Sequence, residues 1–365
     1  MKKGTKILIG IAIVLIIFRL LLPTIVLRYV NNALQNIDGY TGHVEDIDIA
    51  LIRGAYQIEG MVIEKVDNEV KEPFMALPLT DLSIQWSALF KGKVVGEITC
   101  DSPIINFSYG PSEEMQQTGA ETDWTLVIKD LMPIEINRFT VNDGKVNLIN
   151  IMSEPQVNVS LNQIQLSMTN LRNAEESEER LPSDVNLTAN FVGANAPVVF
   201  NAKMLILKEI PDFEFDLSVD NYPLQDINEL TKFYTGMDFE KGTLSMYSEM
   251  GLKDSQLEGY LKPLTKDLKI FKFNENDTEG DKRSVGEFLK ELGAEVGSKI
   301  LTNRKKDQVA AKIPIKGNVE NVETTFWPIL FSTIKNAYIE AFKKEFENQY
   351  YFSKIGTEKS DEPKK

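Results

Sequence analysis

A long apolar segment near the N-terminus constrains this chain more than any other feature. Residues 7–27 read ILIGIAIVLIIFRLLLPTIVL, and Arg19 is their only charge. At a rise of ~1.5 Å per residue, a helix of this length just crosses the ~30 Å hydrocarbon core of a bilayer. Lys2, Lys3 and Lys6 precede the segment, which favours a cytoplasmic N-terminus and a large domain on the far side of the membrane. The anchor residues are Ile7, Ile11, Leu15, Phe18, Leu22 and Leu27.

Two other interpretations of this segment compete with the anchor. A cleaved signal peptide also has a basic start, but it has a shorter apolar run and a small-residue cleavage site, and no A-x-A pattern follows here. A buried core helix of a soluble domain would carry a polar face, which this segment lacks. Arg19 is near enough to the far end to extend its charge to the surface, and Pro23 predicts a kink near the exit.

The charge of the chain is unevenly distributed and restricts its partners. The net charge is −14 over 365 residues, whereas the first 37 residues hold five basic residues and no acidic one, which leaves −19 for the rest. An acidic body argues against binding nucleic acid and against broad docking on anionic headgroups. The length suits one large β domain or two ordinary ones.

Alternation of apolar and polar residues dominates the chain after residue 46 and predicts half-buried strands. In the middle of the chain a bulge near Asn162-Gln163 would place two apolar sets of opposite parity on one face. The sequence Asn142-Asp143-Gly144 predicts a hairpin turn, and the polar stretch 110–123 predicts an exposed loop. The expected strands are 47–51, 56–66, 74–86, 93–109, 125–128, 134–141, 145–151, 157–168, 185–191, 213–219, 242–250, 256–262, 266–273 and 309–315.

Few helices are expected after the anchor. The anchor helix should continue over 29–37, and apolar spacing predicts a short helix at 224–234. Ser284 and Glu287 have the spacing of a capping box at the start of a helix over 284–301, and a long helix follows at 327–352. The expected division is a cytoplasmic start and anchor at 1–28, a β-groove domain at 29–320, an amphipathic helix at 321–352 and a disordered tail at 353–365.

These strands and helices together predict a mainly β fold built on a long, curved antiparallel sheet, because short connections favour antiparallel neighbours. Three helices are too few to cover the apolar face of such a sheet. The face is either sealed in a dry sandwich or barrel, or it lines a trough that acyl chains cover. The candidate lining residues are Val157, Val159, Leu161, Val185, Leu187, Phe191, Phe213, Phe215, Leu217 and Val219.

The chain offers little material for catalysis. Cys100 and His43 are the only residues of their kinds, so disulfides, zinc clusters and histidine-based triads are not expected. The motifs G-x-S-x-G, G-x-x-x-x-G-K-[ST] and G-x-G-x-x-G are absent. Glu45, Asp46 and Asp48 lack calcium-loop spacing. We therefore expect neither catalysis nor a cofactor or metal, although the many carboxylates formally leave a glycosidase open.

Several diffuse motifs give the chain a resemblance to AsmA-like proteins. They lie at 29–34 (YVNNAL), 42–48 (GHVEDID), 53–56 (RGAY), 81–89 (DLSIQWSAL), 241–249 (KGTLSMYSE), 259–263 (GYLKP) and 317–319 (GNV). The resemblance implies an inner-membrane anchor and a periplasmic β-groove in a double-membraned bacterium. Larger relatives are thought to carry phospholipid toward the outer membrane or to support its assembly. The partners implied are membrane phospholipid, outer-membrane assembly or transport proteins, or further copies of the chain.

The length of the chain departs from those larger relatives. Some sixteen strands spaced ~4.8 Å apart would make a trough of roughly 75–80 Å, which is too short to span a periplasm alone. The leading hypothesis is a protein that handles lipid or maintains the envelope without catalysis. The alternatives are an envelope scaffold with a closed β core that binds protein partners, and a carbohydrate-active enzyme.

Overall fold

The structure is a computed structural model in which part of the chain is described. The described residues are 3–50, 54–66, 70–84, 95–109, 112–119, 122, 124, 127, 135–150, 157–171, 180–194, 196–205, 211–228, 237–272, 301–303, 308–310 and 312–318.

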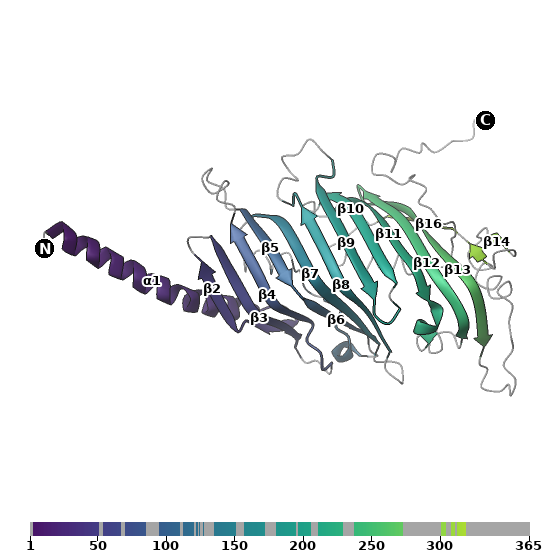
Figure 1. The fold of residues 1–365 in the computed structure, drawn as a ribbon, viewed down its shortest axis with the longest axis horizontal. Helices are drawn as coiled ribbons and strands as arrows, with labels where there is room; N and C mark the ends of the chain where they lie inside the picture. The colour runs from purple at the N-terminus through teal and green to yellow at the C-terminus, as the bar shows by residue number, and fades with distance from the viewer. Residues whose placement is uncertain are drawn as a thin grey trace.

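Helix α1 (Lys3–Leu34) is longer than the expected anchor (Figure 1). It passes through Pro23 and through the boundary predicted at residue 28 as one element, and it ends three residues before the predicted end at residue 37. By length and composition this helix can cross a membrane. Two short 3₁₀ turns, η1 (Glu113–Met115) and η2 (Leu224–Ile227), are also described, and Trp124 and Val127 are helical residues outside them.

All described strands belong to one 16-stranded sheet, which confirms the mainly β prediction. In Figure 1 the strands succeed one another along the long axis of the molecule, and α1 projects from the end that carries β2. The strands are β1 (Tyr40–His43), β2 (Asp46–Ala50), β3 (Ala55–Lys65), β4 (Met75–Ile84), β5 (Val95–Asp101), β6 (Ile104–Tyr109), β7 (Glu135–Asn150), β8 (Val157–Thr169), β9 (Ser183–Phe191), β10 (Pro197–Leu205), β11 (Asp212–Pro223), β12 (Met237–Lys253), β13 (Gln256–Lys272), β14 (Leu301–Asn303), β15 (Gln308–Ala310) and β16 (Ile313–Asn318).

The sheet is shorter than sixteen separate strands would make it, because three pairs of strands lie end to end. Strands β1 and β2 both pair with β3, β5 and β6 both lie between β4 and β7, and β15 and β16 both pair with β13. The ladder therefore has 13 positions, and at ~4.8 Å per step it extends roughly 58 Å. The expected 75–80 Å was wrong for this reason.

Pairing is antiparallel except where β7 runs parallel to β5 and β6. Residues 110–134 separate β6 from β7, and a connection of this length can return the chain to the start of a parallel neighbour. The predicted hairpin at Asn142-Asp143-Gly144 was wrong, since β7 runs straight through these residues. Asp143 takes φ 53° and forms a bulge in β7. The bulge faces the break between β5 and β6, where Ser102 N–H donates to Asn142 O at 2.8 Å.

The predicted bulge in β8 is confirmed. Gln163 takes φ 52°, and the register against β9 shifts between Asn162 and Gln165. Leu161 and Leu166 have opposite parity in the sequence, but they lie opposite Phe191 and Leu187, which share a face of β9. Both apolar sets of β8 therefore lie on the same face of the sheet.

Other predictions differ from the structure at specific elements. Strand β10 was not predicted. The strand expected at 125–128 was wrong at Val127, which is helical, and its other residues lie outside the described ones. The helix expected at 224–234 begins as the 3₁₀ turn η2, and its remainder from 229 lies outside the described residues. The helix expected at 284–301 also lies outside them except for Leu301, which begins β14. The helix at 321–352 and the tail at 353–365 lie wholly outside them.

Part of the stretch predicted as an exposed loop at 110–123 is instead buried against the first strands, although Glu114 is exposed. Gln117 is fully buried, and its Nε2 donates to Asn106 O at 2.8 Å. Gly119 N–H donates to the Tyr40 hydroxyl at 3.0 Å, and Thr122 Oγ1 donates to the carbonyl of Asp38 at 2.7 Å. These bonds satisfy the buried polar groups of the stretch, which is why a polar sequence can be buried here.

Candidate functional site: a continuous apolar face

Strand register places apolar residues in a row that crosses the whole sheet. Residues directly opposite one another in a ladder share a face, so the pairing can be followed from β2 to β16. The first row is Ile47, Ile58, Thr80, Cys100, Val141, Leu166, Leu187, Phe200, Leu217, Ser248, Leu261 and Ile313. Ten of these twelve positions are apolar, and the two hydroxyl residues are small.

A second row on the same face lies two residues along each strand. It consists of Ile49, Tyr56, Leu82, Ile98, Phe139, Met168, Val185, Ala202, Phe215, Met250, Gly259 and Ile315. The Tyr56 hydroxyl is its only polar side-chain group. We call these two rows together the apolar face.

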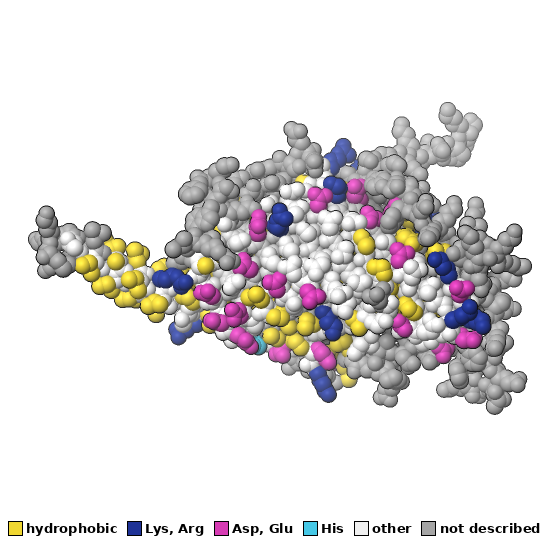
Figure 2. Space-filling view, in the orientation of Figure 1, with side chains coloured by type: hydrophobic (Ala, Val, Ile, Leu, Met, Phe, Trp, Pro, Cys, Tyr) yellow, Lys and Arg dark blue, Asp and Glu magenta, His cyan; other side chains and the backbone are white. Residues whose placement is uncertain are grey.

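The opposite face of the sheet is polar. Its matching row is Asp48, Gln57, Asp81, Thr99, Thr140, Ser167, Asn186, Asn201, Asp216 and Glu249. Cross-strand bonds join neighbours in this row, such as Asn201 Nδ2 to Asp216 Oδ2 at 2.9 Å. Figure 2 shows scattered acidic side chains and few hydrophobic ones over the middle of the sheet on the side that it presents. The sheet is therefore amphipathic from β2 to β11, whereas at β12 and β13 this row continues with Glu249 and Tyr260, which are buried.

The two hydroxyl residues of the first row, Ser248 and Thr80, have local partners. Ser248 Oγ donates to Tyr260 O at 2.8 Å, and Thr80 Oγ1 lies 3.8 Å from Cys100 Sγ. Burial raises the pKa of the Cys100 thiol, opposed by the Thr80 hydrogen bond, and burial raises the pKa of Tyr56 to about 12. Cys100 is buried in β5, as predicted, and its raised pKa disfavours the reactive thiolate.

The predicted lining residues all lie on strands that form the middle of this face. Val185, Leu187, Phe215 and Leu217 belong to the two rows, and Val219 lies in line with them on β11, opposite Val198. The side chain of Val157 is not among those that the structure describes. The others are Val159 and Leu161 on β8, Phe191 on β9 and Phe213 on β11.

Burial is incomplete in the middle of the face. Leu187, Phe200, Phe215 and Leu217 each keep part of their surface exposed, whereas small neighbours such as Ala202 are buried. In the part of the chain that the structure describes, no strand lies outside the one sheet, and Ile227 of the short turn η2 packs against the core that includes Val198 and Val219. The large apolar side chains therefore contact mainly one another across the strands, as Phe200 and Phe215 do with ring centroids 5.2 Å apart.

Sequence reasoning missed the part of the face on β10. Phe200 lies between Leu187 and Leu217, and Ala202 between Val185 and Phe215. The signal was present, because Val198, Phe200, Ala202 and Met204 alternate with more polar residues or with Val199. The contributions of β4, β5 and β7 were not predicted, because pairing with other strands places their apolar residues on this face.

The face ends in an aromatic cluster near the anchor. Tyr40, Phe74 and Trp124 pack together, with centroid distances of 4.9 Å for Tyr40–Phe74 and 5.3 Å for Phe74–Trp124. Trp124 Nε1 donates to Gly119 O at 2.8 Å. This cluster belongs to the same buried core as Val30 and Leu34 of α1 and Ile47 and Ile49 of β2.

The anchor residues divide into two groups. Ile7, Ile11, Leu15 and Phe18 are more than half exposed on α1, as a lipid-facing surface requires. Leu22 and Leu27 instead pack against the core at the start of the sheet. These two predicted anchor residues therefore join the helix to the domain.

The polar residues of the described chain do not assemble into a metal site, since no three His, Cys, Asp or Glu side chains gather there. His43 ends β1 with its side chain exposed. The chain matches no protein-family model, and no curated protein matches it. The continuous apolar face is the candidate functional site.

Proposed function

We propose that this protein is a non-enzymatic lipid-handling protein of the cell envelope, anchored in the inner membrane with its sheet in the periplasm. The observation that carries the proposal is the pair of apolar rows, which run from β2 to β16 with large side chains left partly exposed in the middle. Neighbouring large apolar side chains that remain partly exposed are typical of a binding surface. Phospholipid acyl chains, lying in a groove that the curved sheet forms, would cover it.

The connection between α1 and the sheet supports this proposal. Leu22, Val26 and Leu27 on the helix pack against the core that contains Ile47 and Ile49, which begin the two rows. An acyl chain leaving the bilayer beside α1 would then find apolar side chains at the first strand. The resemblance to AsmA-like proteins supports the same location and the same class of ligand.

The size of the sheet restricts the role. At roughly 58 Å by strand spacing, the groove is shorter than a periplasm is wide. The protein would hand lipid to a partner or a second copy, or act near its own membrane. The competing function is a scaffold, in which the same face is a sealed core and protein partners bind elsewhere on the domain.

Lipid analysis of two matched variants tests the proposal. Phe200 lies on the apolar face, and Val199 is its immediate neighbour on the opposite face with 36% of its surface exposed. The full-length chain, Phe200→Gln and Val199→Gln would each be purified in mild detergent, washed, and extracted for lipid mass spectrometry. Thermal unfolding of each sample reports whether the variant is folded.

We expect phospholipid to co-purify with the wild-type chain and with Val199→Gln, and to be reduced in folded Phe200→Gln. Absence of phospholipid from the wild-type chain would contradict the proposal. Unfolding of Phe200→Gln, together with a wild-type sample free of lipid, would favour the scaffold, because a polar residue in a sealed core is strongly destabilising. Glycan turnover that depends on one carboxylate would favour an enzyme.

A further inference from the structure

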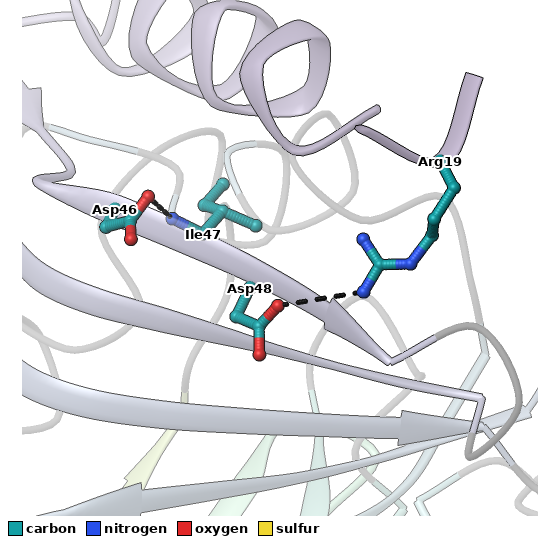
Figure 3. A network of polar contacts seen from close by, with 4 residues as sticks. All are labelled: Arg19, Asp46, Ile47 and Asp48. Atoms are coloured by element: carbon teal, nitrogen blue, oxygen red, sulfur yellow. Dashed lines mark hydrogen bonds and ion pairs between the residues drawn. The ribbon is translucent and has the colours of Figure 1, made fainter. Parts of the chain in front are cut away.

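An ion pair between Arg19 and Asp48 joins the apolar helix α1 to β2, at the start of the sheet. The Arg19 guanidinium lies 4.0 Å from Asp48 Oδ1, with 42% and 69% of the two side chains exposed (Figure 3). Asp46, on the same side of β2, accepts a hydrogen bond from Ile47 N–H at 2.8 Å. β2 therefore lies beside α1 at the level of Arg19, which is well inside the apolar segment.

The helix beyond Arg19 is fixed to the sheet. Val30 and Leu34 are buried, and Leu22 and Val26 pack against the same core. Asn31 forms side-chain hydrogen bonds with the backbone of Val44, just before β2. Because the helix and the sheet are joined along this length, the depth of Arg19 in the membrane also sets the depth of β2.

Strand β2 cannot lie within hydrocarbon. Among the described strands it pairs with β3 alone, so its other edge presents backbone N–H and C=O groups that need water or another polar partner. Asp48 is a carboxylate on that edge, and an ion pair at 4.0 Å with both side chains partly exposed does not compensate for removal from water. The edge of the sheet must therefore remain outside the hydrocarbon core.

The apolar run before Arg19 is compatible with this limit. Residues 7–18 are uninterrupted by charge, and as a helix they extend ~18 Å. Lysines precede the run and Arg19 follows it. Long basic side chains at both ends can reach the headgroups, and the bilayer can thin locally, which together accommodate a core of ~30 Å.

We propose that the hydrocarbon boundary on the domain side lies at Arg19, and that the β2 edge of the sheet rests in the headgroup layer. The edge carries Asp46 and Asp48 beside Arg19, a mixture of charges that suits zwitterionic headgroups. The exposed apolar side chains of Leu21 and Ile25 then lie in the interfacial layer, and Tyr29 lies at its outer side. If the proposed lipid function holds, the apolar face begins at the membrane surface, but the boundary does not depend on that function.

Single-cysteine labelling tests the boundary in the full-length chain. Cys100→Ala removes the only cysteine, and one cysteine is then placed at Leu15, Tyr29, Asp48 or Val192. Val192 is 49% exposed in the turn between β9 and β10 and serves as the water-exposed control, whereas Leu15 serves as the lipid-exposed control. Each variant is reconstituted in phosphatidylcholine nanodiscs and treated with a membrane-impermeant maleimide.

We expect the Asp48 and Tyr29 positions to react at rates close to that of Val192. Leu15 should react roughly 100-fold more slowly, because the reactive thiolate is disfavoured in hydrocarbon by the cost of burying a charge there. Asp46→Cys repeats the test on the same edge in case the substitution at Asp48 disturbs the ion pair. Protection of the Asp48, Asp46 and Tyr29 positions equal to that of Leu15 would overturn the proposal.

Discussion

Asn31 on α1 binds both backbone polar groups of Val44. Its Nδ2 donates to the Val44 carbonyl at 3.1 Å, and its Oδ1 accepts from the Val44 N–H at 2.7 Å. This pair of bonds holds the chain between β1 and β2 against the helix. The two bonds form the polar part of the attachment between the helix and the sheet, and Val30 and Leu34 form its apolar part.

Replacing Asn31 by Ala should therefore loosen the anchor from the domain. The two bonds are partly buried, and leaving the Val44 groups without them should lower the free energy of unfolding by about 1–3 kcal/mol. Asn36→Ala is the matched control, because Asn36 Nδ2 makes an exposed local bond to Asn32 O. Thermal unfolding in detergent measures both, and an equal effect of the two substitutions would contradict the assignment.

Gly119 allows the aromatic cluster to close. Its φ is +69°, and a Cβ there would lie 2.5 Å from Cζ of Phe74, whose ring is stacked on Trp124. Gly193 has a φ of +85° but has no atom within 4 Å of the same position. Gly193→Ala should therefore cost only the backbone strain, about 1–2 kcal/mol. Gly119→Ala adds a clash in a packed core, so its total cost should be about 2–5 kcal/mol. Equal losses on chemical unfolding would show that the Phe74 ring moves freely.

The pH dependence of stability should report the Tyr247–Asp220 bond. The Tyr247 hydroxyl donates to Asp220 Oδ1 at 2.6 Å, and burial together with this carboxylate raises the pKa of Tyr247 to about 12. An unfolded tyrosine has a pKa of about 10, so the contribution is complete below about pH 10 and is lost as the pH rises toward 12.

Urea unfolding of the wild-type chain and of Tyr247→Phe, at about pH 8.5 and about pH 11, measures this contribution. The variant lacks the hydroxyl bond and should be the less stable protein at the lower pH. Its stability should also fall less than that of the wild-type chain between the two conditions. Parallel losses in both proteins would place the alkaline sensitivity elsewhere.

Local patterns in the sequence predicted the anchor, the strands and the face on which their apolar residues lie. The Gln163 bulge could be inferred because apolar parity changes across it in β8, a signal carried by neighbouring residues. The Asp143-Gly144 turn could not be excluded in the same way. The dipeptide Asp-Gly occurs both in hairpin turns and in bulges. Here the break between β5 and β6 at Ser102-Pro103, which lies beside Asp143 in the sheet, favours the bulge.

Features that depend on which strands pair across long stretches of the chain were not predictable from the sequence. The end-to-end placement of β5 and β6 between β4 and β7 shortens the sheet, and nothing in either strand alone indicates it. Burial of Gln117 depends on the Asn106 carbonyl, which the fold brings to it. The apolar face itself was predicted only for β8, β9 and β11, because its continuity is a property of register across all the strands.

Photo-crosslinking at two adjacent residues of β9 tests the central claim most directly. Leu187 lies on the apolar face, between Leu166 and Phe200, and Asn186 lies on the polar face between Ser167 and Asn201. A photoreactive amino acid at each position, in cells whose phospholipid is radiolabelled, reports what contacts each side of one strand. The account predicts labelled lipid on the protein at position 187 and none at 186. Adducts to protein alone at 187 would contradict it and would indicate a sealed core.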